Sequence, residues 1–160
     1  MSSPAGGPDL VAVHLLGMPV DVYRRASEHS DELIREFALI RGDETDHVPA
    51  RLLTLIDELN VRFAPFTQGQ TEQLQEALAR GDAEIDLLYE VPAEASEGVV
   101  RLMTLLDEAD AFCRNGDLLT LATPPEALDL RRWFLEEFVF QIDGRPPRPW
   151  STFPRGAAGG

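Results

Sequence analysis

One unit recurs three times along this 160-residue chain and constrains its fold more than any other feature. An apolar stretch of strand length is followed by one or two prolines and then by a long stretch with helical spacing of apolar residues. The clearest copy is DAEIDLLYEVPAEASEGVVRLMTLLDEADAFCRN at residues 82–115, and looser copies cover residues 10–40 and 118–143. Proline suits such a junction because it ends strand pairing and tolerates the first turn of a helix. The repeat predicts three strands, each followed by a helix.

Two further helices are predicted between the first and second copies. Residues 49–63 carry a helical stripe of apolar side chains, and residues 71–80 form a shorter stripe that Gly81 ends. Residues 65–70 contain a proline and a glycine and are predicted to be a connector. The expected fold class is therefore a helix-rich α/β domain with about three strands, four main helices and one short helix.

The strands differ in their expected burial. Residues 10–16 are apolar at nearly every position, so this strand is expected to be covered on both faces. Residues 85–91 largely alternate apolar and acidic side chains, which predicts one buried face and one partly open face. A right-handed crossover makes the third strand, residues 118–122, parallel to the second.

The composition of the two ends separates them from the body of the chain. Residues 1–9 are small and breaker-rich and are expected to be disordered, whereas residues 10–144 form one globular domain. The tail at residues 145–160, RPPRPWSTFPRGAAGG, contains three arginines and no acid. We expect it to fold back onto the acidic body through Trp150 and Phe153 and to be disordered afterwards. An extended segment that binds a partner is the alternative.

The charge of the chain excludes some classes of partner. A net charge of −14 repels phosphate backbones and anionic lipid, so neither nucleic acid nor a membrane surface is expected to bind. No apolar run reaches membrane-helix length and no secretory leader is recognised, which favours a cytoplasmic location. The one cysteine, Cys113, lies on an apolar helix face and is expected to be buried.

No complete catalytic, nucleotide-binding or metal motif is found, and the chain contains no lysine. The interpretation therefore leans away from an enzyme, and no cofactor is expected. Acidic residues at positions 43, 44 and 46 with His47 have the side-chain types of a metal site. The presence of these acidic residues is already explained by their position before a helix N-terminus, because the helix dipole favours negative charge there. His14 and His29 are each expected to be hydrogen-bonded structural histidines.

Two charged residues interrupt apolar helix faces. Asp110 falls among Val99, Met103 and Leu106, and Arg131 falls among the apolar positions of the last helix. A buried charge is costly unless it is paired. We predict that Asp110 and Arg131 form a structural ion pair that joins the second and third units.

Two large aromatics on the last helix predict a contact surface. Trp133 and Phe140 are seven residues apart and are expected on the polar face, beside Glu136 and Glu137. Aromatic side chains on a polar face are typical of a surface covered by another chain. The candidate partner-binding residues are therefore Trp133, Phe140, Glu136, Glu137 and Trp150. Either a partner protein, including a second copy of the chain, or the tail itself is expected to cover them.

The stretch RLLTLIDELN at residues 51–60, placed after a strand and a long helix, resembles the start of the GHKL-type anti-sigma serine kinases. That family uses a glutamate and an asparagine four residues later for magnesium and ATP. Here Arg62 stands four residues after Glu58, Asn60 is out of register, and the glycine-rich lid motifs of the family are absent. This resemblance implies a scaffold without the kinase site.

Several phrases resemble a family of small actinobacterial proteins of unassigned activity that we associate with genes for anti-sigma factors and their antagonists. The phrases are HSDELIREFALI, YEVPAEASE, LLDEADAFCR, LLTLATPPEAL and RRWFLEEF. The resemblance covers residues 10–150. It implies a regulatory context and assigns no role to any residue.

Three functions stay open at this point. The first is a non-enzymatic cytoplasmic regulatory protein that binds a protein partner in a sigma-factor or stress signalling pathway. The second is a small-molecule or nucleotide sensor with a pocket near the strand ends at residues 17–19 and 89–92. The third, ranked last, is a metal-dependent enzyme that uses the histidines with nearby acids.

Overall fold

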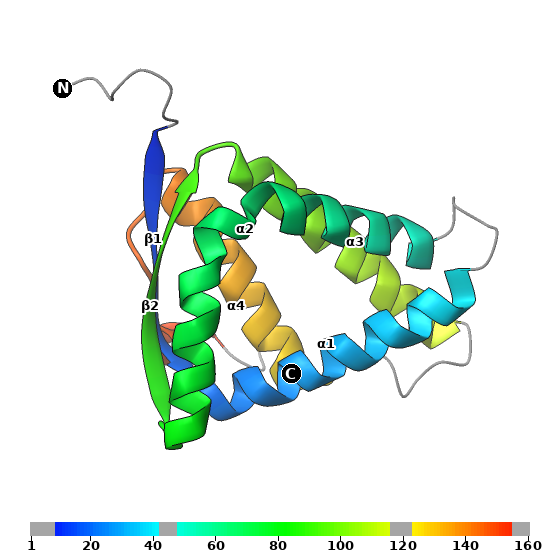
Figure 1. Ribbon diagram of the computed structural model, residues 1–160, viewed down its shortest axis with the longest axis horizontal. Coiled ribbons are helices and arrows are strands. Elements are labelled where there is room, and N and C mark those ends of the chain that lie inside the picture. Colours follow the sequence, from blue (N-terminus) through cyan, green and yellow to red (C-terminus); the bar gives the residue numbers. More distant parts are fainter. Residues whose placement is uncertain (1–8, 42–47, 116–122, 155–160) are drawn as a thin grey trace.

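A computed structural model of the chain describes residues 9–41, 48–115 and 123–154 (Figure 1). The described elements confirm the helix-rich α/β class. In chain order they are β1 (Leu10–Pro19), α1 (Val20–Arg41), α2 (Val48–Arg80), β2 (Glu84–Pro92), α3 (Ala95–Asn115), α4 (Pro125–Ile142) and the short 3-10 helix η2 (Trp150–Thr152). The sheet formed by these residues has two strands, and the predicted third strand at residues 118–122 lies outside the described residues.

The two strands pair in antiparallel fashion, with Leu10 opposite Pro92 and Pro19 opposite Glu84. Between Leu15 and Met18 the register shifts, so that two residues of β1 face one residue of β2. Gly17 has φ +67° and donates its backbone N–H to Asp86 Oδ1 at 2.7 Å. Glycine fits this bulge because it adopts positive φ without a steric penalty.

One face of the sheet is buried and the other is open. All the helices lie on one side of the sheet (Figure 1), which buries Val13, Leu15, Met18, Leu87, Tyr89 and Val91. The expected alternation in β2 is confirmed. The expectation that β1 is covered on both faces is wrong, since Ala12 and His14 are exposed and Leu10 keeps 46% of its surface exposed. The layer of helices covers one face of this two-stranded sheet. The side chains on the other face of β1, among them Leu10 and Ala12, are therefore exposed although they are apolar.

His14 of β1 and Leu88 of β2 lie opposite each other in the sheet. At each of these two residues a glutamine side chain forms hydrogen bonds with the outer edge of the strand. Gln141 of α4 accepts the backbone N–H of His14 at 2.7 Å and donates to its carbonyl oxygen at 2.8 Å. Gln70 of α2 donates to the carbonyl oxygen of Leu88 at 2.6 Å. These contacts satisfy edge groups that otherwise pair with another strand. They also attach the sheet to α4 on one side and to α2 on the other.

Helix α2 runs through the segment that was predicted to be a connector. Residues 65–70 are helical, and Pro65 lies inside one helix of 33 residues. Proline removes one backbone hydrogen bond and bends a helix, and Figure 1 shows α2 changing direction sharply between its two halves. The first half packs along α3 and the second half along β2. The predicted short helix is thus the second half of a bent one.

The buried side chains form two clusters. The sheet-side cluster joins β1 and β2 to α4 and to the tail, and includes Met18, Tyr89, Trp133 and Phe138. The helical cluster lies where α1, α2 and α3 meet, and includes Leu33, Phe37, Leu52 and Leu105. Cys113 is fully buried in the helical cluster, as predicted, and burial raises the pKa of its thiol.

Candidate functional site

A pocket of about 300 Å³ lies between α1, α3 and α4. Its walls come from both clusters. Leu130 belongs to the sheet-side cluster, against which Ala26 and Phe134 pack. Leu33 belongs to the helical cluster, against which Leu106 packs. The full lining is Tyr23, Ala26, Ser27, His29, Ser30, Leu33, Leu102, Leu106, Thr123, Ala127, Leu130, Arg131, Phe134 and Leu135. Ligand sites commonly form where helices of a bundle diverge and leave a mainly apolar space with a few polar groups.

Short polar side chains on α1 leave room for this pocket. Ser27 and Ser30 lie on the α1 face that turns toward α3 and α4, and Ser30 is exposed at the pocket's mouth. Larger apolar residues at these positions would fill the space, because interiors are otherwise close-packed. Small polar residues on an otherwise apolar helix face are therefore the sequence signal of this pocket, and the sequence-based prediction missed it.

His29 lines the pocket and carries a buried polar atom of an unusual kind. Within residues 9–41, 48–115 and 123–154, its Nε2 is the one buried side-chain nitrogen or oxygen without a hydrogen-bond partner. The prediction of a hydrogen-bonded structural histidine is wrong for this atom. An unpaired buried polar atom costs about 1–3 kcal/mol, so this nitrogen lowers the stability of the fold.

Tyr23 lies at the same wall of the pocket. Burial raises the pKa of the Tyr23 hydroxyl, a hydrogen bond with Ser27 opposes this effect, and the charge of Asp31 adds to it. The hydroxyl therefore keeps its proton at neutral pH. It is a neutral hydrogen-bonding group in the pocket wall.

The pocket also borders the predicted ion pair of Asp110 and Arg131. Arg131 Nη2 lies 3.0 Å from Asp110 Oδ2 and 3.2 Å from Asp107 Oδ1, and Nη1 donates to Thr123 Oγ1 at 3.2 Å. Thr123 in turn donates its hydroxyl to Asp110 Oδ1 at 2.7 Å. The pair joins α3 to α4, as expected, and Thr123 extends it to the start of α4. These groups satisfy one another and form a polar border of the pocket.

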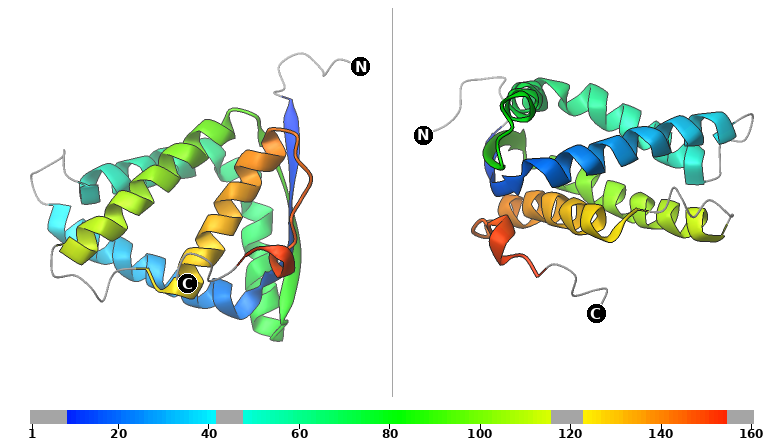
Figure 2. Two further views of the ribbon diagram at one scale, coloured as in Figure 1. Left: turned by 180° about the vertical axis from the view of Figure 1, so that it is seen from behind. Right: turned by 90° about the horizontal axis from the view of Figure 1, so that it is seen from below.

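The face predicted for a partner is covered by the tail. Trp133 has no exposed surface, and the expectation that it lies on the polar face of α4 is wrong. Its indole nitrogen donates to the carbonyl oxygen of Arg148 at 2.8 Å, and its ring meets Trp150 edge to face at 5.5 Å. Trp150 and Phe153 are buried, which confirms that the tail folds back through them. Figure 2 shows this segment returning along α4 and β1.

The glutamates of that face hold the tail. Glu137 is fully buried and accepts from Arg148 twice, from the guanidinium at 2.7 Å and from the backbone N–H at 2.8 Å. Arg148 also lies 3.1 Å from Glu136, and the guanidinium groups of Arg145 and Arg148 lie over the Phe140 ring. Four of the five predicted partner-binding residues therefore bind Arg148 or Arg145, and Trp150 belongs to the tail itself.

The remaining predicted sites do not come together. Residues 17–19 lie opposite residues at the start of β2, whereas residues 89–92 lie opposite the start of β1. The predicted pocket between these segments is wrong, because antiparallel pairing places them at opposite ends of the sheet. His14 lies on the outer face of β1 and His29 in the pocket of α1. His47 and the acidic residues before it lie outside the described residues.

No group of three or more histidine, cysteine or acidic side chains in the described part of the chain could hold a metal ion.

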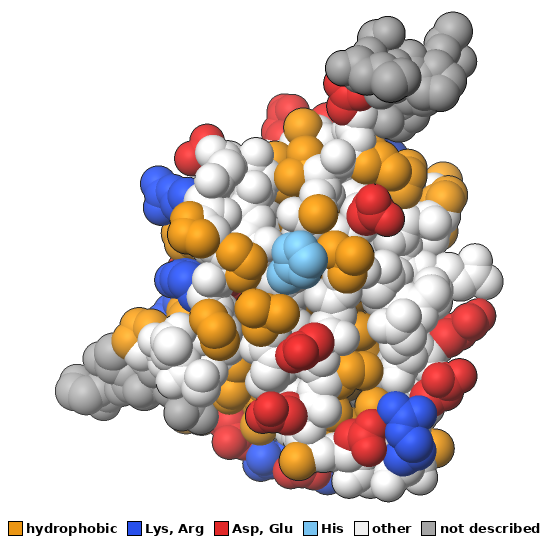
Figure 3. Space-filling model, turned by 90° about the vertical axis from the view of Figure 1, so that its left-hand side faces the viewer, with side chains coloured by type: hydrophobic (Ala, Val, Ile, Leu, Met, Phe, Trp, Pro, Cys, Tyr) orange, Lys and Arg blue, Asp and Glu red, His pale blue; other side chains and the backbone are white. Residues whose placement is uncertain are grey.

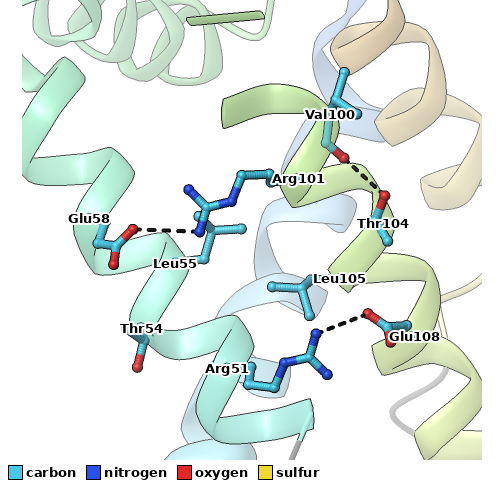
Figure 4. A pocket seen from close by; sticks show the side chains of 9 residues that line it. All are labelled: Arg51, Thr54, Leu55, Glu58, Val100, Arg101, Thr104, Leu105 and Glu108. Carbon is cyan, nitrogen blue, oxygen red and sulfur yellow. Dashed lines mark hydrogen bonds and ion pairs between the residues drawn. The ribbon is translucent and has the colours of Figure 1, made fainter. Parts of the chain in front are cut away.

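A second hollow, of about 430 Å³, lies between the first half of α2 and α3 (Figure 4). Two ion pairs cross it: Arg51 with Glu108 at 3.7 Å, and Arg101 with Glu58 at 3.8 Å. The four charged side chains that line this hollow therefore already form ion pairs with one another. This hollow therefore offers fewer unpaired groups to a ligand than the pocket between α1, α3 and α4.

No helix within the described ranges combines the length and apolar character needed to cross a bilayer. Comparison of the chain with family models, with curated proteins and with solved structures finds no match. Function is therefore inferred from the chemistry of the pocket itself.

Proposed function

We propose that this protein binds a small, largely apolar molecule in the pocket between α1, α3 and α4. The observation that carries this proposal is a pocket of about 300 Å³ whose described walls are mainly leucine, alanine and phenylalanine side chains, with a few polar groups such as Tyr23, His29 and Ser30. Its volume lies at the lower end of the roughly 300–1,000 Å³ that is typical of small-molecule sites. A function as a sensor or carrier of such a molecule follows from this arrangement.

The polar groups around the pocket favour binding over catalysis. Asp110, Thr123 and Arg131 bond to one another, and Tyr23 keeps its proton. A general base or nucleophile needs a partner that activates it at the reacting atom. In the described part of the pocket lining, His29 is the remaining candidate, and its contacts place no activating group on Nε2.

A fluorescence titration tests this function. 1-Aminoanthracene, an uncharged apolar dye, is expected to bind saturably at one site with increased emission. Ser30→Phe places a ring in the pocket mouth and is expected to weaken binding at least tenfold, since Ser30 is exposed there and the fold tolerates a larger side chain. The matched control is Val100→Phe, an exposed position in the hollow between α2 and α3.

Equal binding by the Ser30→Phe variant and the parent chain contradicts the proposed site. If the Val100→Phe variant alone loses binding, the dye binds in the hollow between α2 and α3 instead. Circular dichroism melting of both variants checks that each one folds.

The outer face of the sheet supports a second candidate function, the binding of a partner protein. Leu10 and Leu88 are 46% and 44% exposed on this face, and hydrophobic side chains gather there around a histidine (Figure 3). Asp86 and Glu90 are also exposed on it, and neither strand contains an arginine. A partner with a basic and apolar surface matches this face. A second copy of the chain matches it less well, because it presents the same acidic residues.

A variant of this face tests the second candidate. Leu88→Arg reverses the character of the face and is expected to abolish cross-linking to a basic partner in the native cell. Leu39→Arg, at a 75% exposed position on α1, serves as the control. Equal cross-linking by both variants removes this face from consideration. Participation in sigma-factor or stress signalling and a cytoplasmic location remain predictions from the sequence.

A further inference from the structure

We infer that the outer face of α2 and α3 is an interface between two copies of this chain. The observation that carries this inference is a row of three ion pairs that joins the two helices: Arg51 with Glu108 at 3.7 Å, Glu58 with Arg101 at 3.8 Å, and Arg62 with Glu94 at 2.8 Å. These six side chains are called the ion-pair ladder below. The inference does not depend on the pocket between α1, α3 and α4 or on its ligand.

The ion-pair ladder alternates in sign along each side. Along the first half of α2 the order is arginine, glutamate, arginine, and the facing side of α3 carries the opposite charge at each level. Residue numbers rise along α2 and fall along α3, so the helices are antiparallel and each pair joins residues at one level. Each of the six side chains keeps 42–57% of its surface exposed. Figure 4 shows two of the pairs reaching across the gap between the helices. The ladder is therefore accessible to another chain.

A ladder of this kind is complementary to a second copy of itself. A two-fold axis parallel to the ladder places α2 of one copy over α3 of the other at the same level, and the facing helices remain antiparallel. Arg51 of one copy then faces Glu108 of the other, and Glu58 faces Arg101. The four helices have the arrangement of an antiparallel four-helix bundle. The pairs within one chain thus define the pairs between two chains.

The two helices are close at one end of the ladder and further apart at the other. A Cβ atom on Gly98 would lie 2.8 Å from Leu59 Cδ2, so α2 and α3 touch there. Toward Arg51 they leave the hollow of about 430 Å³, and the two ion pairs that cross it are long. Arginine carries five N–H groups, and one carboxylate at such a distance does not use all of them. A second copy therefore adds contacts to these arginines without breaking the pairs within the chain.

The side chains beside the ladder also favour contact with a second copy. Val100 lines the hollow and is 47% exposed. Val61 follows Thr54 of the hollow by seven residues, so it lies on the same face of α2, and it is 83% exposed. The six ladder side chains sum to zero charge, whereas the chain has a net charge of −14. Two copies that meet at the ladder bring matched charges together, which offsets the repulsion between two acidic chains.

Sedimentation velocity of the full chain over a range of concentrations tests the dimer. We expect a Kd on the order of 10 μM, because exposed ion pairs each contribute little. Raising the NaCl concentration from about 0.1 M to about 1 M shortens the Debye length from about 10 Å to about 3 Å and is expected to weaken the dimer roughly tenfold. A monomer at every concentration up to about 200 μM overturns the inference. A dimer whose Kd does not change with salt overturns it as well.

Two charge-reversal variants of the full chain test the face. The acidic variant carries Arg51→Glu and Arg101→Glu, and the basic variant carries Glu58→Arg and Glu108→Arg. Each variant alone is expected to be monomeric at about 200 μM, because like charges then face each other across the two-fold axis. An equimolar mixture is expected to form a dimer with one chain of each kind, since acidic positions then face basic ones. The four positions are exposed, so both variants are expected to fold, and circular dichroism melting checks this.

The matched control carries the same change of charge at another place. Arg24→Glu together with Arg80→Glu replaces two exposed arginines, one on α1 and one at the end of α2, that form ion pairs elsewhere. This variant is expected to dimerise like the parent chain. If it becomes monomeric, the effect belongs to the net charge and the inference is overturned. Dimerisation of the acidic variant alone, or a mixture of the acidic and basic variants that stays monomeric, also overturns it.

Discussion

At the scale of single residues, Asp110 and Arg131 differ in their burial from the exposed ion pairs of the described residues. The side chain of Asp110 is 6% exposed and that of Arg131 is 18% exposed, whereas the pair of Arg101 and Glu58 is more than half exposed on both sides. Solvent screens the exposed pairs, so they contribute little to stability. The buried pair matters because its removal leaves a charge without compensation.

We predict that Asp110→Ala lowers the free energy of unfolding by about 3–5 kcal/mol. The variant leaves Arg131 without its closest carboxylate and Thr123 without the acceptor of its hydroxyl. Urea unfolding followed by circular dichroism measures the loss. Glu58→Ala, which removes an exposed pair at 3.8 Å, is the control and is expected to change stability by less than about 1 kcal/mol. Equal unfolding midpoints for the two variants contradict the structural role of Asp110.

At the scale of elements, α4 connects parts of the chain that the sequence separates widely. Its residue Gln141 bonds to both backbone groups of His14 in β1 and donates to Glu137, which holds Arg148 of the tail. The same helix contributes Ala127, Leu130 and Arg131 to the pocket. A change at Gln141 therefore acts on the sheet edge and on the support of the tail together.

We predict that Gln141→Leu destabilises the protein more than Gln70→Leu does. Gln141 is buried, and its replacement leaves the N–H and carbonyl of His14 unpaired at a partly buried edge, at a cost of about 1–3 kcal/mol. Gln70 covers an edge where Leu88 is exposed, so water replaces its hydrogen bond. Hydrogen exchange of the His14 amide, measured by NMR, is expected to accelerate in the first variant alone. Equal stability of the two variants contradicts this difference.

At the scale of the whole molecule, the tail completes the sheet-side cluster. Trp150 and Phe153 stack at 6.0 Å, and both belong to the same buried cluster as Val13 and Leu15 of β1. Arg148 supplies the counter-charge of the buried Glu137. The segment that differs most in composition from the body is thus part of its core, and the body depends on it for the burial of Trp133.

We predict that truncation after Gly144 destabilises the protein by about 3–5 kcal/mol, because it leaves the Glu137 carboxylate buried without Arg148. It also exposes Trp133, whose fluorescence is expected to shift to longer wavelength. A Trp150→Phe variant of the full chain isolates the Trp133 signal for comparison. Arg145→Ala, at an exposed tail residue, is the control with little expected change. Unaltered Trp133 emission after truncation contradicts the tail as its cover.

The local pattern predicted most of the elements and one tertiary contact. The strands and helices of the first two repeated units, the buried Cys113 and the pair of Asp110 and Arg131 follow from side chains whose cost of burial or exposure is large. The pattern failed where packing overrides local preference. Pro65 lies inside α2 because both halves of the bent helix gain contacts, one with α3 and the other with β2.

The candidate site was predicted less well, since it depends on how three helices diverge. Ser30 and Leu33 of α1 line the same pocket, but helical spacing alone does not show whether the neighbouring helices fill the room that a serine leaves. The strand ends proposed for a pocket require a parallel sheet, and the pairing is antiparallel. Trp133 was assigned to a surface because a helical projection of α4 does not include the tail that covers it.

The sequence by itself determined the fold class, the positions of β1, β2, α1, α3 and α4, and the need to pair Asp110, because these follow from periodicity and from the cost of an unpaired charge. Only the tertiary structure decided the antiparallel register, the burial of Trp133 beneath the tail and the pocket beside His29. Those features arise from contacts between segments far apart in the chain, such as Gln141 with His14, which no local pattern encodes.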